Sequence, residues 1–482
     1  MQLVATGAQD IWLTGNPIVT YFKVVYRRHT NFAMESIRQS FDCSPDFGKT
    51  LTSLISRNGD LISSIYFQAT LPDIPANTDN QIYTAWTDNI GHHLLKRIDL
   101  EVGGQLIDRQ YGDWLEIWSQ LSVPAGQMAG YREMIGQDPP GPLGLNLGLQ
   151  RDRASAILPG RTIYVPLQFW FCRNVGLALP LIALQYHEVK ITVELRPLKE
   201  LIACFDTQAT GNTVSYPLPI MDELIDPALW VDYIFLDVEE RRRFAQVTHE
   251  YLVEQIQLNT FTFPGASTNN EVTLDLHLEN PVKELIWVAQ YQAGVTNGHV
   301  QWSNYTDRSS VNYPTFGKGI LNLESLGSII YDSLASKRGS SINLQTATNP
   351  THTLPPGGLN PVLNGRVILN GNDRFSIQDG NYFNLIQPFR HHTNIPVSPG
   401  INVYSFSLKP ELHQPSGTCN FSRIDKKQLI LTLRSGSNQS ILPTDDSIAV
   451  NFIQSDVTVR VYGVNYNIFR VMSGMGAIAY TK

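Results

Sequence analysis

The sequence predicts an all-β protein made of two consecutive β-sandwiches. Short segments in which apolar and polar residues alternate recur along all 482 residues, and such alternation is typical of half-buried strands. The 35 glycines and 28 prolines are scattered between these segments, which suits many short strands joined by turns. A single core stops growing near roughly 250–300 residues, so we expect two domains.

The first half is predicted to contain an N-terminal arm, residues 1–25, and a first domain, residues 26–238. The arm turns at Gly15-Asn16-Pro17 and then alternates from Val19 to Val25, which reads as the approach to a first strand. A long Pro- and Gly-rich insertion, Val123–Pro159, is expected to be functional or irregular. The predicted strand segments are Leu61–Pro72, Leu94–Trp118 with a turn at Gly103-Gly104, Thr162–Cys172, Tyr186–Leu195 and Leu229–Asp237, with a short helix over Leu198–Phe205.

The second half is predicted to follow a short helical linker, residues 239–246, and to form a second domain over residues 247–482. The linker sequence EERRRFAQ places acids before bases, which matches the helix dipole. A looser region, Ser303–Asn360, is expected to carry another long surface loop. The predicted strands include His249–Phe263, Glu271–Leu278, Val282–Gln290 and Val403–Leu408.

The two halves contain a related segment. Leu100–Trp118 can be placed over Ile368–Ile386 without a gap, so that Gly103 meets Gly371 and Gly112 meets Gly380, each 268 positions apart (371 minus 103, 380 minus 112). This spacing is far longer than a solenoid or propeller repeat. It indicates two copies of a whole domain.

Composition favours a globular protein that does not coat nucleic acid. Hydrophobic residues at 42% and charged residues at 16% argue against disorder and coiled coil. The net charge of −7 argues against a broad basic face for phosphate backbones. The cysteines are far apart and are expected to be buried free thiols, with neither a zinc site nor a dense disulfide scaffold. They are Cys43, Cys172, Cys204 and Cys419.

Neither secretion nor membrane insertion is predicted. The N-terminus MQLVATGAQD lacks a basic start followed by an apolar core. The most apolar stretch, Tyr164–Leu184, is interrupted by Arg173 and Pro180, whereas a membrane span needs roughly 18 uninterrupted apolar residues. We therefore expect a soluble protein with unmodified N-x-S/T sequons at Asn304, Asn420 and Asn438.

The most specific stretch runs from Tyr404 to Asp425. Its sequence LKPELHQPSGTCNFSRID resembles a signature near the C-terminal end of the major capsid proteins of large nucleocytoplasmic DNA viruses, including iridovirus-like and phycodnavirus-like groups. The arm sequence GAQDIWLTGNPIVTYFKVVYRRHTNF and the central LWVDYIFLDVEERRRFAQVTHEYLVEQIQ are similar to the same family. The likeness covers most of the framework and is weakest in the two long loops.

The resemblance implies more than the periodicity, which leaves the jelly roll and other Greek-key sandwiches open. It implies two consecutive eight-stranded jelly rolls, a double jelly roll, with long surface loops and short helices. The protein would be a structural, non-enzymatic major capsid protein that forms homotrimers, pseudo-hexagonal capsomers and the icosahedral shell of a large double-stranded DNA virus. It would be located in the virion, after synthesis and assembly inside the infected host cell, in the cytoplasm.

The resemblance also implies the partners of the chain. These are further copies of itself, in the trimer and between capsomers, and minor capsid proteins that contact the arm and the capsomer base. No direct binding to the genome and no cofactor are expected. The signature reads as one copy of a duplicated corner, with Tyr404–Leu408 as a core strand, Lys409–Cys419 as a stiff connection and Phe171–Tyr186 as its counterpart. We expect this corner to contact another chain through His413 and Gln414.

No catalytic, cofactor-binding or metal site is predicted. Nucleotide-binding, hydrolase and zinc-protease motifs are absent from the sequence. His187-Glu188 and His249-Glu250 lack a second histidine four residues on, and both fall in predicted strands. In the pairs His92-His93 and His391-His392, neighbouring residues on a strand would point to opposite faces, so one pair alone cannot converge on a metal.

The alternative interpretation is a two-module β-sandwich carbohydrate-binding protein or glycosidase. Asp275 and Glu279 are candidates for its paired acids, although scattered acids are more often solvated. The basic clusters Arg27-Arg28-His29 and Arg241-Arg242-Arg243 invite a nucleic-acid interpretation, but a strand end and a helical linker explain them better. Core packing or subunit contact explains most of the tryptophans, which are expected in strands; they are Trp12, Trp86, Trp114, Trp118, Trp170, Trp230, Trp287 and Trp302.

Overall fold

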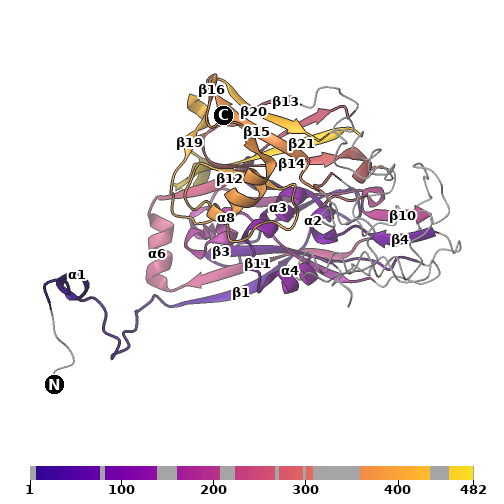
Figure 1. The fold of residues 1–482 in the computed structure, drawn as a ribbon. Coiled ribbons are helices and arrows are strands. Elements are labelled where there is room, and N and C mark those ends of the chain that lie inside the picture. Colours follow the sequence, from indigo (N-terminus) through magenta and orange to yellow (C-terminus); the bar gives the residue numbers. More distant parts are fainter. Residues whose placement is uncertain are drawn as a thin grey trace.

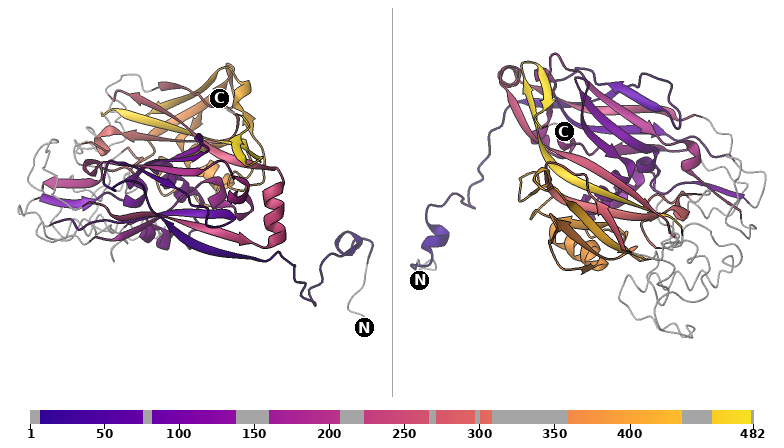
Figure 2. Two further views of the ribbon diagram at one scale, coloured as in Figure 1. Left: turned by 180° about the vertical axis from the view of Figure 1, so that it is seen from behind. Right: turned by 90° about the horizontal axis from the view of Figure 1, so that it is seen from above.

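Two β-sandwiches lie one above the other in a computed structural model of the chain (Figure 1). An N-terminal arm extends away from both (Figure 2). Helix α6, Val238–Gln246, follows the last strand of the first half, where EERRRFAQ predicts a helix. The structure describes residues 7–75, 82–137, 160–206, 223–265, 271–296, 300–307, 359–434 and 455–480.

The first sandwich consists of two antiparallel sheets. One has the order β1-β11-β3-β7, with β8 also on β3, and the other has the order β2-β9-β5-β6. Strands β4 and β10 pair as a ribbon beside them. The strands are β1 Phe32–Gln39, β2 Thr50–Leu54, β3 Leu61–Thr70, β4 Ile82–Trp86, β5 Leu95–Val102, β6 Gln105–Tyr111, β7 Thr162–Pro166, β8 Leu179–Pro180, β9 Val189–Leu195, β10 Ile202–Asp206 and β11 Ile225–Leu236.

The second sandwich repeats this arrangement. One sheet has the order β12-β21-β14-β18, with β19 on β14 and β22 on β21, and the other has the order β13-β20-β15-β16, with β17 on β15. The strands are β12 His249–Phe263, β13 Glu271–Asp275, β14 Pro281–Tyr291, β15 Val362–Leu369, β16 Asn372–Asp373, β17 Gln378–Asp379, β18 Asn402–Ser405, β19 Cys419–Asn420, β20 Lys427–Leu433, β21 Val457–Met472 and β22 Met475–Ile478.

Even the irregularities of the two sandwiches coincide. In the pairing of β3 with β11 the register skips Ser63, and in the equivalent pairing of β14 with β21 it skips Lys283. A β-bulge of this kind inserts one residue into one strand of a pair. Two four-stranded sheets packed face to face in this order form a jelly roll, so the prediction of two consecutive eight-stranded jelly rolls is confirmed.

The repeat between Leu100–Trp118 and Ile368–Ile386 is structural, but it ends in a helix. In each copy a strand turns at a glycine with positive φ, 59° at Gly103 and 80° at Gly371. A second strand follows, and then helix α3, Gly112–Ser122, or the π-helical turn η6, Tyr382–Ile386, with α8, Gln387–His391. The predicted strand through Trp118 is therefore wrong. Its apolar residues recur with the i, i+3, i+4, i+7 spacing of a helix: Trp114, Ile117, Trp118 and Leu121.

The arm leads into the first strand, but its alternating run, Val19–Val25, is not itself a strand. The first strand begins at Phe32, and within the described part of the arm the regular element is the four-residue helix α1, Ile11–Thr14. An isolated strand has no partner for its backbone hydrogen bonds, and the arm lies away from every sheet (Figure 2). The alternation from Val19 to Val25 therefore describes exposed side chains.

Other expectations are corrected locally. Thr162–Cys172 ends in helix α5, His187 and Glu188 precede β9, and Leu198–Phe205 is a short helix followed by β10. The insertion after Val123 contains helix α4 up to the last described residues, and most of the two predicted long loops, 138–159 and 308–358, lies outside the described residues. These and the remaining helices are α2 Ile90–Leu94, α4 Met128–Met134, α5 Trp170–Arg173, η2 Val175–Leu177, η3 Leu181–Ala183, η4 Leu198–Glu200, η5 Gln292–Gly294 and η7 Phe421–Arg423.

One hydrophobic core passes between the two sandwiches. The outer face of the sheet β12-β21-β14-β18 contributes Ile286 and Tyr462 to the same buried cluster as Trp114 and Trp118 of α3. The tryptophan rings of α3 are stacked, and Trp114 lies 5.4 Å from Tyr462. Dry apolar contact of this kind is expected to hold the two sandwiches as one body. Of the tryptophans expected in strands, Trp86, Trp230 and Trp287 are so placed, whereas Trp12, Trp114, Trp118 and Trp170 lie on helices and Trp302 in a loop.

Candidate functional site

The signature corner, residues 404–425, is a loop at the edge of the second sandwich. Residues of the loop form hydrogen bonds with one another. Its strand, β18, ends at Ser405, earlier than the predicted Tyr404–Leu408. The loop closes where the backbone N–H of Leu408 donates to the carbonyl of Ser416 at 3.2 Å. It ends in β19 and a 3-10 turn, as its first-half counterpart ends in β8 and η3. The duplicated corner is therefore present.

A buried lysine lies under this corner. Lys283 is the bulged residue of β14, and its Nζ donates to the carbonyl of Pro410 at 2.5 Å. Its charge is paired with Glu254 of β12 at 2.6 Å, and Arg173 of the first sandwich also contacts Glu254, at 2.9 Å. Burial lowers the pKa of Lys283. Burial alone would raise the pKa of Glu254, but the charges of Arg173 and Lys283 outweigh it and lower this pKa.

The same corner is tied to the end of α8 by a histidine. The Nδ1 of His392 lies 2.9 Å from Oε1 of Glu411, a signature residue, and its Nε2 lies 3.1 Å from Glu284. Burial alone would lower the pKa of His392, but the two carboxylates raise it to about 9. His392 is therefore charged at neutral pH. Pro410 and Glu411 thus have intramolecular roles that the sequence alone did not indicate.

A second ionic cluster joins the sandwiches around Asp113. Arg196 of the first sandwich lies 3.3 Å from Asp113, and Arg460 of the second lies 3.5 Å from it. The guanidinium of Arg196 also stacks on Trp302, 3.7 Å from the ring centroid. Burial alone would raise the pKa of Asp113, but the charge of Arg460, the nearby ring of His93 and the charge of Arg196 hold it well below its usual range. The cluster links side chains that are distant in sequence.

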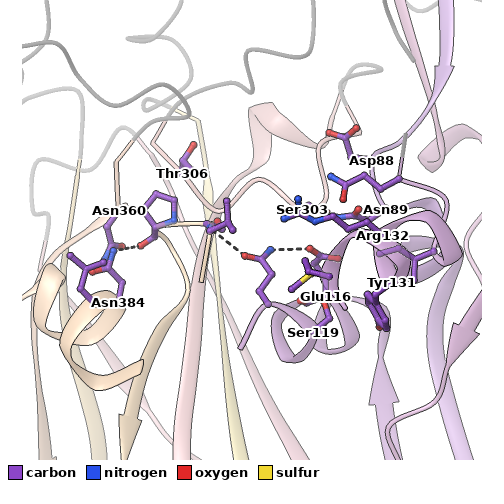
Figure 3. A pocket seen from close by; sticks show the side chains of 18 of the residues that line it. Asp88, Asn89, Glu116, Ser119, Tyr131, Arg132, Ser303, Thr306, Asn360 and Asn384 are labelled. Atoms are coloured by element: carbon purple, nitrogen blue, oxygen red, sulfur yellow. Dashed lines mark hydrogen bonds between the residues drawn. The ribbon is translucent and has the colours of Figure 1, made fainter. Parts of the chain in front are cut away.

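A polar cleft of about 470 Å³ lies between the sandwiches beside this cluster (Figure 3). Gln120 spans it, because its Nε2 donates to Glu116 at 2.9 Å and its Oε1 accepts from the backbone N–H of Ser398 at 3.1 Å. The opposite wall carries the amides of Asn360 and Asn384. Gln120 thus joins the two walls through Ser398, whereas Asn360 and Asn384 donate to groups of the second sandwich itself.

Strands were expected at the histidine pairs, but His92, His93 and His391 lie on helices and His392 directly follows α8. His92 of α2 lies 2.7 Å from Glu116 and 2.8 Å from the hydroxyl of Tyr131. His93 instead lies 2.7 Å from the Ser303 hydroxyl, and burial lowers its pKa. His391 contacts the carbonyl of Leu408. In the described ranges no three His, Cys, Asp or Glu side chains gather as a metal site.

The other candidate polar residues are separate from these clusters. Asp275 accepts from Gln428 at 2.8 Å on an exposed strand end, and Glu279 lies on the turn after it. Arg241 of the linker helix α6 pairs with Asp60 of the first sandwich at 3.0 Å. Asn304 and Asn420 each accept a hydrogen bond from the residue two positions on, and Asn438 is outside the described residues.

The cysteines differ from the expectation of buried thiols. Cys43 is an exposed free thiol, and Cys172 and Cys419 are free and partly buried. Burial raises the pKa of Cys172 to about 12, which keeps it protonated. The sequence had no signal that separated the exposed thiol from the other two.

Among the described residues, large apolar side chains are exposed on the arm and on the segment η6–α8. The arm presents Trp12 and Phe22, which are 92% and 98% exposed. The helical segment η6–α8 presents Phe389, which is 75% exposed, together with Leu385 and Ile386. Large exposed apolar groups in clusters mark contact sites. Arg27, Arg28 and His29 lie exposed on the arm as well.

Comparison with known proteins gives the same relatives for both halves. Residues 20–237 match the family described as major capsid protein N-terminus, and residues 240–477 match the large eukaryotic DNA virus major capsid protein. The major capsid protein of Phaeocystis pouchetii virus is 43% identical and that of Paramecium bursaria Chlorella virus 1 is 36% identical, each match covering 100% of this chain and 99% of the relative. These matches do not support a carbohydrate-binding or glycosidase interpretation.

Solved structures agree. The chain resembles the protein in the PBCV-1 virus capsid with a TM-score of 0.71 and 32% identity, over 96% of this chain and 100% of that one. It resembles the Faustovirus major capsid protein with a TM-score of 0.67 at 13% identity, over 97% and 94% of the two chains, which is a likeness of fold. Among the described residues, no helix is both long and apolar enough to cross a membrane.

Proposed function

This chain belongs to the major capsid protein family of large eukaryotic DNA viruses, and we propose that three copies of it associate into a pseudo-hexagonal capsomer. As a member of this family it is a structural protein of the virion and forms the icosahedral capsid. The trimer rests on one observation: each chain carries two jelly rolls with the same strand order. Three such chains supply six similar wedges around a closed ring.

We assign the proposed contacts to successive parts of the chain. The arm, residues 1–25, contacts minor capsid proteins at the capsomer base, since the apolar side chains of its described part, such as Trp12 and Phe22, are not covered by the chain's own sandwiches. The jelly rolls occupy residues 26–238 and 247–482, with the helical linker 239–246 between them. Capsomers then join one another through further copies of the same chain.

We propose that the protein is not an enzyme and has no cofactor or metal site. The buried carboxylates Asp113, Glu116 and Glu254 are paired with cations or histidines that hold elements together. Direct genome binding is not expected, because the chain has a net charge of −7. Arg241 of the basic triplet is moreover paired with Asp60.

Native mass spectrometry and light scattering of the purified chain test the trimer. The expected result is a species of three chains that persists on dilution, as obligate interfaces above about 2,000 Å² do. Stable monomers at high concentration would contradict the proposal.

A further inference from the structure

Two histidines of helix α2 each join a carboxylate of α3 to a hydroxyl group. His92 and His93 are consecutive, so their side chains leave the helix in different directions. Asp113 and Glu116 are three positions apart and lie on one face of α3, which packs against α2. His92 lies 2.7 Å from Glu116, and Nδ1 of His93 lies 3.6 Å from Oδ1 of Asp113. Each histidine therefore has an acid of its own.

The second ring nitrogen of each histidine meets a hydroxyl group at the wall of the polar cleft. Nε2 of His92 lies 2.8 Å from the hydroxyl of Tyr131, and Nε2 of His93 lies 2.7 Å from Oγ of Ser303. Both hydroxyl-bearing residues line the cleft of about 470 Å³, and Figure 3 shows them on the same side of it. Two acid–histidine–hydroxyl series therefore end in one cleft.

The series Asp113–His93–Ser303 has the order of a nucleophilic serine site. In such a site one ring nitrogen accepts the hydroxyl proton while a carboxylate orients the other nitrogen. The separation of 3.6 Å between His93 and Asp113 exceeds a hydrogen bond, and contacts of this kind are often long until a reactant binds.

His93 is in the protonation state that a general base requires. Its ring is fully buried, and burial lowers its pKa. The carboxylates of Asp113 and Glu116 act in the opposite direction, whereas the charge of Arg196 acts with burial. The neutral imidazole can therefore accept a proton at neutral pH.

The cleft has the groups that an acyl transfer needs beside Ser303. The side chain of Ser303 is partly exposed, so its hydroxyl is reached from the cleft. Nδ2 of Asn89 donates to the same Oγ at 3.3 Å, which places an N–H donor beside the point where negative charge develops when a serine attacks a carbonyl group. Met128 and Ile135 line the cleft as well, and such apolar side chains hold the hydrocarbon part of a ligand.

We propose that Ser303 is a covalent modification site that accepts one acyl group per chain from an activated acyl donor, a thioester. Oγ attacks the carbonyl carbon of the thioester, so that an O–C bond forms and the C–S bond breaks. The hydroxyl proton passes to Nε2 of His93 and then to the departing sulfur. The products are an O-acyl serine and a thiol. Because the ester stays on the chain, the step is compatible with a structural protein that is not an enzyme.

A fluorophosphonate probe tests the nucleophile, because it loses fluoride to an activated serine. The purified full chain is treated with the probe and digested, and peptide mass spectra are expected to show one label, on Ser303. Ser303→Ala is expected to remove it. His93→Gln retains a side chain that can bond the hydroxyl but is not a base, and it is expected to slow labelling at least about 100-fold. The control is Ser422→Ala, at an exposed serine whose Oγ accepts the backbone N–H of Asn280, and it should leave the rate unchanged.

The pH profile of labelling is measured on the unaltered chain, so it does not depend on the folding of a variant. Because the neutral form of His93 is the base and burial lowers its pKa, the rate is expected to rise with pH and to reach half its plateau below pH 6.5. A rate that instead follows the hydroxide concentration over the whole range would overturn the role of His93 and with it the proposal.

A butyryl thioester of a small thiol tests the acyl class. It is expected to add one butyryl group to Ser303 in the unaltered chain and none to Ser303→Ala. Failure of the thioester to acylate Ser303, with or without fluorophosphonate labelling, would overturn the proposal, and so would equal labelling of folded His93→Gln. Native mass spectra of the same samples report the trimer separately, so failure of the modification site and failure of the proposed capsomer are distinguishable.

Discussion

Arg173 of the first jelly roll forms a 2.9 Å ion pair with Glu254 of the second, which joins the two halves of the chain inside a buried contact. Glu254 also neutralises Lys283, the bulged residue of β14. One carboxylate therefore balances two cations, at the point where the signature corner lies against the sheet. Removing a partner from such a group leaves an uncompensated buried charge.

Glu254→Gln is expected to lower the free energy of unfolding by about 3–5 kcal/mol, because Arg173 and Lys283 lose their shared counter-charge. Urea denaturation followed by tryptophan fluorescence measures it. The control is Glu250→Gln, which breaks an ion pair with Arg470 at 2.7 Å, with both side chains about half exposed. That change is expected to cost about 0–1 kcal/mol, and equal losses in the two variants would refute the role of Glu254.

The glycines that start the duplicated helices are expected to be sterically required. A Cβ at Gly112 would overlap the carbonyl oxygens of His92 and Leu95, and one at Gly380 would overlap that of Val362. Either change to alanine is expected to lower the free energy of unfolding by at least about 1–3 kcal/mol. Gly130→Ala in α4 has open space around the new methyl group, and it should be neutral or slightly stabilising.

The charge on His392 is expected to make stability depend on pH. Its pKa is raised from 6.5 to about 9 in the folded chain, so the folded state binds the proton more tightly than the unfolded state. Its contribution is complete below about pH 6.5 and is lost as the pH rises towards 9, by about 3 kcal/mol. Thermal unfolding at pH 6 and pH 9 measures the difference. In His392→Gln this part of the pH dependence should disappear; if it persists, other groups cause it.

Removal of residues 1–14 is expected to leave trimers intact and to weaken shell assembly. The deleted segment precedes the first strand, β1, and Ile11, Trp12 and Leu13 of its described part lie in solvent. Size-exclusion chromatography reports the trimer, and electron microscopy of assembly reactions reports shells. Loss of the trimer itself would show that the arm belongs to the capsomer.

His413→Ala together with Gln414→Ala is expected to impair assembly more than monomer stability. Gln414 is exposed and His413 partly so, whereas the neighbouring Glu411 is tied to His392. Glu411→Gln is the matched comparison, and it should lower stability first. The yield of shells and the unfolding midpoint are measured for each variant. A similar loss of both in the double variant would make the corner a purely structural feature.

The alternation of apolar and polar residues predicted some elements correctly and others wrongly, and each outcome has a physical reason. Alternation located β3, β12 and β14 closely, because a half-buried strand must alternate whatever packs on it. It wrongly predicted a strand through Trp114 and Trp118, because the apolar residues that follow Gly112 also fit the spacing of a helix. On the arm an alternating run has no partner strand, and the strand to which it leads begins only at Phe32. The ion pairs around Glu254 left one trace in the sequence, a lysine inside the apolar run VKELIWVAQ.

By itself the sequence determined the all-β class, the duplication and the family, since each depends on local pattern or on quoted motifs. The tertiary structure decided which copy of a duplicated element is covered. Ile117 and Leu385 have the same apolar character in the same position, but one is buried by the second sandwich and the other faces solvent. Burial depends on what the fold brings alongside a residue, and local sequence does not record the neighbour.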